Sequence, residues 1–255
     1  RRYSSIRNDA QIQFDPQSPI WRIAIHRLAA IYEHLAALGD LSGGLEKAED
    51  LYREAIRRFP EDSRTAEAWY RLGRIANLIA RDRLREKRAE EAARRFQEAA
   101  TNLRQALAVA EGDLASRPGV GGADLGAIEV DLDPPVRPEV MARQARYTLA
   151  DALYERALAA PEADRPGLLA EAFAAYEEAV GQHPEGLDEA WGFYQEGQIH
   201  RLLGRPERAK SALDRTLSVL EKARTGGSLE RPEGIDPGYW AGILEWEARF
   251  RQERR

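Results

Sequence analysis

Cysteine is absent from all 255 residues of the sequence. Its absence excludes disulfide bonds, thiol nucleophiles and the cysteine-based zinc and iron–sulfur sites. An oxidising compartment would tolerate such a chain, and so would a reducing one, so the redox environment stays open.

Long apolar runs are also absent. No stretch approaches the roughly 18 consecutive apolar residues that a membrane-spanning helix needs, and no charged-then-apolar leader stands at the N-terminus. The sequence opens Arg1-Arg2-Tyr3 without an initiator methionine, and its only methionine is Met141. We therefore expect a soluble chain, processed or trimmed, whose leader or anchor has been removed.

The sequence has no large excess of charge of one sign. It carries 38 basic and 43 acidic residues, for a formal charge of −5, and the two signs are interleaved. The densest basic stretch runs from Arg81 to Arg95, but Asp82, Glu86, Glu90 and Glu91 are threaded through it at helical salt-bridge spacings. A solvated helix face is favoured there over a nucleic-acid surface, and we expect no nucleic-acid partner.

Recognisable catalytic and metal-binding motifs are missing. None of His26, His34, His183 and His200 stands in a metal-ligand spacing, and no Gly-x-Ser-x-Gly turn occurs. The glycines of 119–122 lack the strand and the lysine of a phosphate loop, and the aspartates at 124, 131 and 133 do not follow the EF-hand order. We predict no catalytic residue, no metal and no cofactor, and hence a protein that is not an enzyme.

Helical periodicity of apolar residues is what the sequence does have, almost throughout. The first helix is well marked, with Ser18 as N-cap, Pro19 at the first helical position and Gly39 after its end. Further helices are predicted over residues 45–59, 64–84, 88–112, 139–160, 166–182, 187–203, 206–223 and 238–253. The predicted class is all-α, with helices arranged in pairs.

A pattern repeats in the second helix of each pair: a small residue, a large one four positions on, and a small one three further. The copies are Ala48, Tyr52 and Ala55; Ala92, Phe96 and Ala99; Ala172, Tyr176 and Ala179; and, more weakly, Ala209, Leu213 and Thr216. Pro60 and Pro184 close the first and third copies, and small residues such as Gly73, Ala150 and Gly197 recur in the first helices. Small residues let two helices approach closely while the large one fills the gap between neighbours.

These residues resemble the tetratricopeptide repeat (TPR) motif, and the resemblance covers roughly residues 29–223. It implies a right-handed solenoid of antiparallel helix pairs with about four degenerate repeats, closed by a C-terminal capping helix. The linker 59–63, continuing to Trp69 and Gly73, also resembles TPR proteins of the bacterial cell envelope, including outer-membrane assembly lipoproteins. That second resemblance favours a bacterial, periplasmic or envelope-associated location over a cytoplasmic one.

The repeats depart from the family's regular period, because Ala48, Ala92, Ala172 and Ala209 are 44, 80 and 37 residues apart. Extra residues make the second and third hairpins unusually tall, and 113–137 is a long insertion loop. Within that loop Ile128, Val130 and Leu132 alternate with acidic residues like a strand. The division we predict is an N-terminal extension (1–18), pairs one and two (19–112), the loop, pairs three and four (138–223), a linker (224–236) and the capping helix (237–255).

The resemblance implies that a peptide or partner subunit binds on the concave face, along the first helices. The matching positions are Tyr70, Arg74, Asn77, Gln144, Tyr147, Asp151, Tyr154, Trp191, Tyr194, Gln198 and Arg201. Packing alone is an equal alternative for the tyrosines, and the peptide-carboxylate clamp of the family is not reproduced.

The leading hypothesis is therefore a non-enzymatic interaction scaffold or adaptor that organises a multiprotein complex. Two alternatives stay open. One is an envelope protein that binds a small molecule or glycan in an aromatic-lined groove with 113–137 as a lid. The other is a structural subunit that docks through 127–133 or the final helix.

Overall fold

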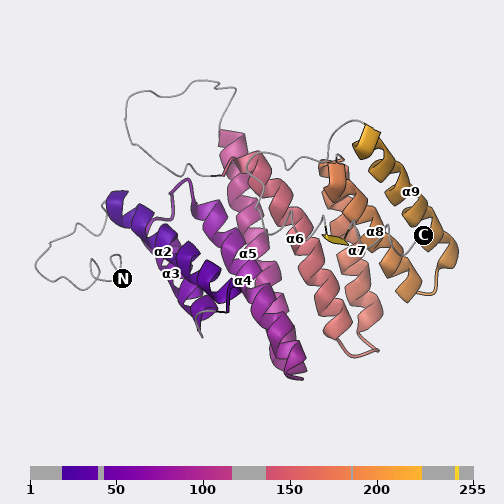
Figure 1. Ribbon diagram of the computed structural model, residues 1–255, viewed down its shortest axis with the longest axis horizontal. Coiled ribbons are helices and arrows are strands. Elements are labelled where there is room, and N and C mark those ends of the chain that lie inside the picture. The colour runs from indigo at the N-terminus through magenta and orange to yellow at the C-terminus, as the bar shows by residue number, and fades with distance from the viewer. Residues whose placement is uncertain (1–18, 40–42, 117–135, 185, 226–244, 247–255) are drawn as a thin grey trace, which may run out of the picture.

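The computed structural model describes residues 19–39, 43–116, 136–184, 186–225 and 245–246. Within these ranges the chain forms eight long α-helices and no strand (Figure 1). They are α2 (Pro19–Ala37), α3 (Gly44–Arg58), α4 (Thr65–Arg85), α5 (Ala89–Ser116), α6 (Pro138–Ala159), α7 (Arg165–Gln182), α8 (Gly186–Leu202) and α9 (Pro206–Thr225).

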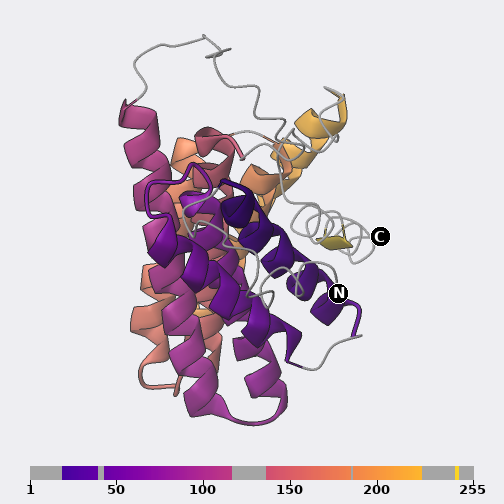
Figure 2. The same ribbon diagram turned by 90° about the vertical axis from the view of Figure 1, so that its left-hand side faces the viewer.

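The helices stack in chain order as four antiparallel pairs: α2 with α3, α4 with α5, α6 with α7, and α8 with α9. Each pair also packs on the next, through α3 and α4, α5 and α6, and α7 and α8, and α4 additionally contacts α6 directly. Figure 2 looks along this array from its N-terminal end, with α2 and α3 in front. We call α2, α4, α6 and α8 the first helices, and their shared open surface the first-helix face.

The repeated pattern of small and large residues forms the core of the pairs. Ala92, Phe96 and Ala99 are 0% exposed, and the equivalent residues of α3 and α7 are buried as well. In the weakest copy Ala209 and Thr216 are buried while Leu213 is partly exposed. The all-α, paired-helix class that these residues predicted is confirmed.

Helix boundaries follow the predicted ones closely, with one clear difference. The helix α2 begins at Pro19, as its fixed φ favours. By contrast α5 runs to Ser116, so residues 113–116 are helical although they were expected to begin the loop. Its final turn, Asp113-Leu114-Ala115-Ser116, contains no proline or glycine to end the helix before Pro118.

The second hairpin is tall, as expected from its extra residues. Helices α4, α5 and α6 have 21, 28 and 22 residues and are the longest in the part of the chain that the structure describes. The lower end of the α4–α5 hairpin extends beyond the neighbouring α2–α3 pair in Figure 1.

Two glycines of the repeat differ in how much they are needed. A Cβ on Gly73 would lie 2.5 Å from Leu103 Cγ, whereas one on Gly197 would be no closer than 3.4 Å to any atom. We expect Gly73→Ala to destabilise the protein by about 1–2 kcal/mol, because overpacking outweighs the better helix propensity of alanine. Gly197→Ala, the matched control, should be neutral or stabilising by about 0.5 kcal/mol.

Urea unfolding of the two variants measures both effects. Equal stabilities for Gly73→Ala and Gly197→Ala would show that the close approach of α4 and α5 does not depend on the missing side chain.

Several expectations fall outside the described residues. These are the extension 1–18 with its N-cap Ser18, the strand-like segment 127–133, most of the linker 224–236 and most of the capping helix. The first two residues of that predicted linker are helical instead, because α9 continues to Thr225. Of the capping helix the structure describes Glu245 and Trp246, which are helical. None of the described helices is both long enough and apolar enough to cross a membrane.

Candidate functional site

The eleven residues predicted to bind a partner lie on the neighbouring first helices α4, α6 and α8. Four of them are buried in this structure: Tyr70, Asn77, Gln144 and Tyr147. The others keep some or most of their surface: Arg74, Asp151, Tyr154, Trp191, Tyr194, Gln198 and Arg201. Seven of the eleven side chains thus keep some exposed surface, although the carboxyl group of Asp151 is itself withdrawn from water.

The buried tyrosines are packing residues here. Tyr70 belongs to the largest apolar cluster and Tyr147 packs with Ala179 and Val180. The Tyr147 hydroxyl lies 3.3 Å from the carbonyl oxygen of His183, to which it donates. Burial raises the pKa of Tyr147 well above its usual range, so this phenol stays neutral. Tyr70 and Tyr147 therefore pack inside the protein, as the alternative to partner binding predicted.

Asp151 connects three helices from the middle of α6. Its Oδ1 accepts a hydrogen bond from the Tyr176 hydroxyl of α7 at 2.5 Å and another from Trp191 Nε1 of α8 at 2.9 Å. Removal from water raises the pKa of Asp151 to about 6, although the two hydrogen bonds act in the opposite direction. By accepting the hydrogen bond from Nε1, the Asp151 carboxyl group orients the Trp191 indole.

Two partly exposed aromatic residues of α8, Trp191 and Tyr194, form a cluster with Trp246. The rings of Trp191 and Tyr194 are stacked, with centroids 5.9 Å apart and planes inclined by 26°. A third ring, Trp246, lies 5.2 Å from each of them, edge-on to Trp191. Across the face on α6, burial and then the neighbouring Tyr194 raise the pKa of Tyr154, while Arg201 acts against them. Tyr154, Tyr194 and Arg201 are thus electrostatic neighbours.

Ion pairs link the first helices along the rest of the face. The guanidinium group of Arg81 on α4 forms an ion pair with Glu155 on α6. The Arg81 Nε lies 2.9 Å from Glu155 Oε1 and 2.8 Å from Oε2. Arg74 lies 3.8 Å from Glu33 of α2, and its guanidinium sits 5.9 Å from the centroid of the Tyr70 ring. These ion pairs connect α2 with α4 and α4 with α6.

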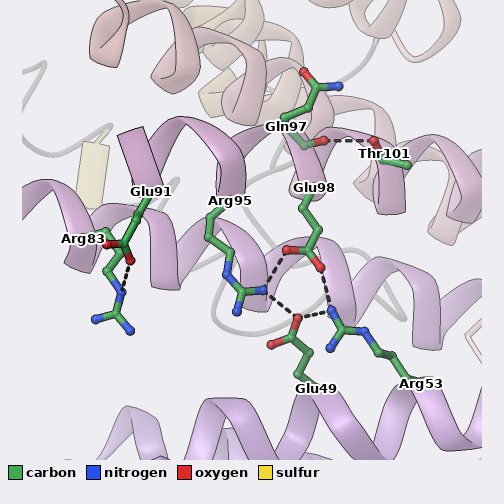
Figure 3. A network of polar contacts seen from close by, with 8 residues as sticks. All are labelled: Glu49, Arg53, Arg83, Glu91, Arg95, Gln97, Glu98 and Thr101. Carbon is green, nitrogen blue, oxygen red and sulfur yellow. Dashed lines mark hydrogen bonds and ion pairs between the residues drawn. The ribbon is translucent and has the colours of Figure 1, made fainter. Parts of the chain in front are cut away.

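The second helices carry a separate charged network, shown in Figure 3. Glu49 of α3 is buried, and its Oε1 is 2.5 Å from Arg53 Nη2 and 2.8 Å from Arg95 Nη1 of α5. Glu98 of α5 accepts from the same two arginines at 2.6 and 2.7 Å. The four side chains close a ring that joins the first hairpin to the second.

The basic stretch 81–95 contains many ion pairs, as the helical spacing of its basic and acidic residues predicted. Besides Arg81 and Arg95, three of its arginines have acidic partners: Arg83 and Arg88 pair with Glu86 and Glu91, and Arg85 with Asp82. These pairs lie near the turn between α4 and α5 and are largely exposed, so each contributes little to stability.

The histidines occupy varied settings. His26 lies beside the Tyr52 ring, and burial lowers its pKa to about 4. The His200 ring packs on Phe173 at 4.9 Å, and His183 Nε2 lies 3.4 Å from Arg146 Nη1. No group of three or more histidine, aspartate or glutamate residues able to hold a metal ion occurs in the described ranges.

Sequence reasoning missed two contributors to this face. The Arg81–Glu155 pair was not selected, because Arg81 was read as one member of a basic stretch. Trp246 was assigned to a cap of the last hairpin, and it does pack with residues of α8 and α9. Its contacts with Trp191 and Tyr194, two of the predicted binding positions, were not foreseen.

No family model matches the chain, and no curated protein matches it in sequence. Among solved structures, a likeness is found to "Crystal structure of MamA", at 15% identity over 76% of this chain and 97% of that one, with a TM-score of 0.28. A second is to "YrrB: a TPR protein with an unusual peptide-binding site", at 16% identity over 86% and 92%, with a TM-score of 0.29. Neither likeness is close enough to transfer a site or a function.

The repeat pattern and its burial decide the architecture. Four antiparallel pairs stack in order, and in each the second helix buries its small and large residues at the motif spacing. The fold is a TPR-like solenoid. The partly exposed side chains of α4, α6 and α8 make aromatic stacking contacts, hydrogen bonds and ion pairs.

Proposed function

We propose that this chain is a non-enzymatic interaction scaffold that binds a peptide or partner subunit along the first-helix face. The observation that carries the proposal is the pair of stacked rings on α8, Trp191 and Tyr194, which the hydrogen bond from Trp191 to Asp151 joins to α6. Tryptophan, tyrosine and arginine are the residue types that dominate binding hot spots, because they bury large areas and make directed polar contacts.

The partner we expect carries aromatic or large apolar side chains together with a carboxylate. Stacked rings on α8 would receive the apolar groups. Arg201, exposed in the last turn of α8, would pair with a carboxylate of the partner. Binding a segment of another protein would make the chain an adaptor within a larger complex, and we place that complex at the bacterial cell envelope on the resemblance of the 59–63 linker.

Site-specific photocrosslinking tests the proposal. A benzophenone amino acid at Gln198, on the first-helix face, should crosslink a protein of discrete mass in a lysate of the source cells. The same group at Gln97, exposed on the second helix α5, is the matched control and should not. Equal capture at the two positions, or capture at Gln97 alone, would place the binding surface elsewhere and refute the proposal.

The two alternative functions depend on the loop 113–137 and on the segment 127–133 or the final helix (237–255), which lie mostly or wholly outside the described residues. No contact among the described side chains favours either of them, and the scaffold is the function that the geometry supports.

A further inference from the structure

Trp246 comes from far along the chain to reach α8. It stands 21 residues beyond Thr225, the last residue of α9, yet its side chain is only 6% exposed. It joins an apolar cluster with Leu187 and Ala190 of α8 and Val219 and Leu220 of α9. Its ring makes two aromatic contacts of 5.2 Å, with Trp191 and Tyr194.

The surface under Trp246 is held in place by contacts that do not involve it. Trp191 Nε1 donates to Asp151, which also accepts from Tyr176, so α6 and α7 set the orientation of the indole. Tyr194 stacks on Trp191 at 5.9 Å. A platform whose geometry is fixed by its own helices can receive an aromatic side chain with little ordering cost.

We infer that Trp191 and Tyr194 form a docking site for an aromatic side chain, that Trp246 is its occupant within the chain, and that a partner must displace Trp246 to bind there. The inference rests on the proposed function and adds two things to it. It names the chemistry of the partner, a segment with an exposed tryptophan or similar ring. It also makes the chain autoinhibited: Trp246 belongs to the same chain as the docking site, so its high effective concentration there competes with any partner.

Competition by a peptide tests the inference on the full chain. The probe is a fluorescent peptide of residues 240–252, Trp-Ala-Gly-Ile-Leu-Glu-Trp-Glu-Ala-Arg-Phe-Arg-Gln. Trp246→Ala protein should bind it at least about tenfold more tightly than the wild type, because its docking site is empty. Adding Trp191→Ala to that variant, or replacing the peptide's own residue 246 by alanine, should remove the gain.

Equal affinity of the wild type and Trp246→Ala for the peptide would overturn the inference, as would binding that ignores Trp191. A purely structural cap predicts the first of these results, equal affinity, together with a lower Tm for Trp246→Ala.

A second measurement keeps the test decisive if Trp246→Ala folds poorly. The wild-type chain is labelled with 5-fluorotryptophan, and the Trp246 signal is assigned by its loss in Trp246→Phe. A saturating concentration of the peptide should shift that 19F resonance to the chemical shift of a solvent-exposed fluorotryptophan. An unchanged chemical shift would overturn the inference. A signal that depends on protein concentration would show that Trp246 of a second copy is the occupant and would also overturn it. If these tests fail while crosslinking at Gln198 persists, the scaffold proposal survives alone.

Discussion

The Asp151→Ala protein is expected to unfold about 3 kcal/mol more easily than the Asp151→Asn protein. Alanine leaves the Tyr176 hydroxyl and the Trp191 indole N–H without their shared acceptor, and each stranded donor costs about 1–3 kcal/mol. Asparagine keeps an oxygen at the same place and removes only the charge. Urea unfolding at pH 7 measures the difference.

The same pair of variants gives a pH signature. The folded-state pKa of Asp151 is about 6, above the usual value near 4, so the folded protein holds this proton more tightly than the unfolded chain. Its contribution to stability is present below about pH 4 and is lost as the pH rises through about 6. Wild-type stability should thus fall relative to Asp151→Asn over this window, by about 1–3 kcal/mol.

The comparison with Asp151→Asn is needed because other groups titrate in the same range. Burial lowers the pKa of His26 to about 4, which makes stability rise with pH between about 4 and 6.5. This contribution is common to both proteins and cancels in the difference. Parallel pH profiles for wild type and Asp151→Asn would contradict the buried setting we describe for the carboxyl group.

Replacing Glu49 by alanine is the second change with a large expected effect, a loss of about 2–4 kcal/mol in the free energy of unfolding. Glu49 is 3% exposed and holds Arg53 and Arg95 at 2.5 and 2.8 Å. Its removal leaves the two guanidiniums with Glu98 as their shared acidic partner in the ring and opens a void between α3 and α5. Thermal and urea unfolding followed by circular dichroism measure the loss.

The control for Glu49 is Asp82→Ala. Asp82 pairs with Arg85 at 2.6 Å, but both side chains are at least half exposed, so its loss should change stability by less than about 0.5 kcal/mol. Similar losses for the two variants would mean that the ring in Figure 3 does not hold the first two hairpins together.

The helix pairs could be predicted from the sequence because their cause is local. A small residue, a large one four positions on and a small one three further share one helix face, and this face must pack against another helix. Those residues are the buried ones in the structure, from Ala48 to Ala179. Helix starts were also readable where proline opens the helix, as at Pro19, Pro138 and Pro206.

The candidate site was less predictable, because inward-pointing positions on different first helices have different depths. Tyr70 and Tyr147 match the family positions as well as Tyr154 and Tyr194 do, but the first two are fully buried. Depth depends on how closely neighbouring helices approach, and that is set by side chains far away in the sequence, such as Leu103 against Gly73.

Contacts across hairpins could not be predicted either. The acceptor role of Asp151 needs donors from α7 and α8, and Glu49 needs an arginine 46 positions away. With 43 acidic and 38 basic residues in the chain, spacing alone does not single out such partners. The placement of Trp246 on α8 is of the same kind.

The central claim is that partners bind the first-helix face through α8, and charge reversal measured on a captured partner tests it most directly. Arg201→Glu on α8 and Lys210→Glu on α9 change the net charge equally, and both side chains are exposed. We predict that Arg201→Glu weakens the partner's Kd by about tenfold, equivalent to about 1.4 kcal/mol, while Lys210→Glu leaves it within about twofold. Equal weakening by the two substitutions, or weakening by Lys210→Glu alone, would contradict the account.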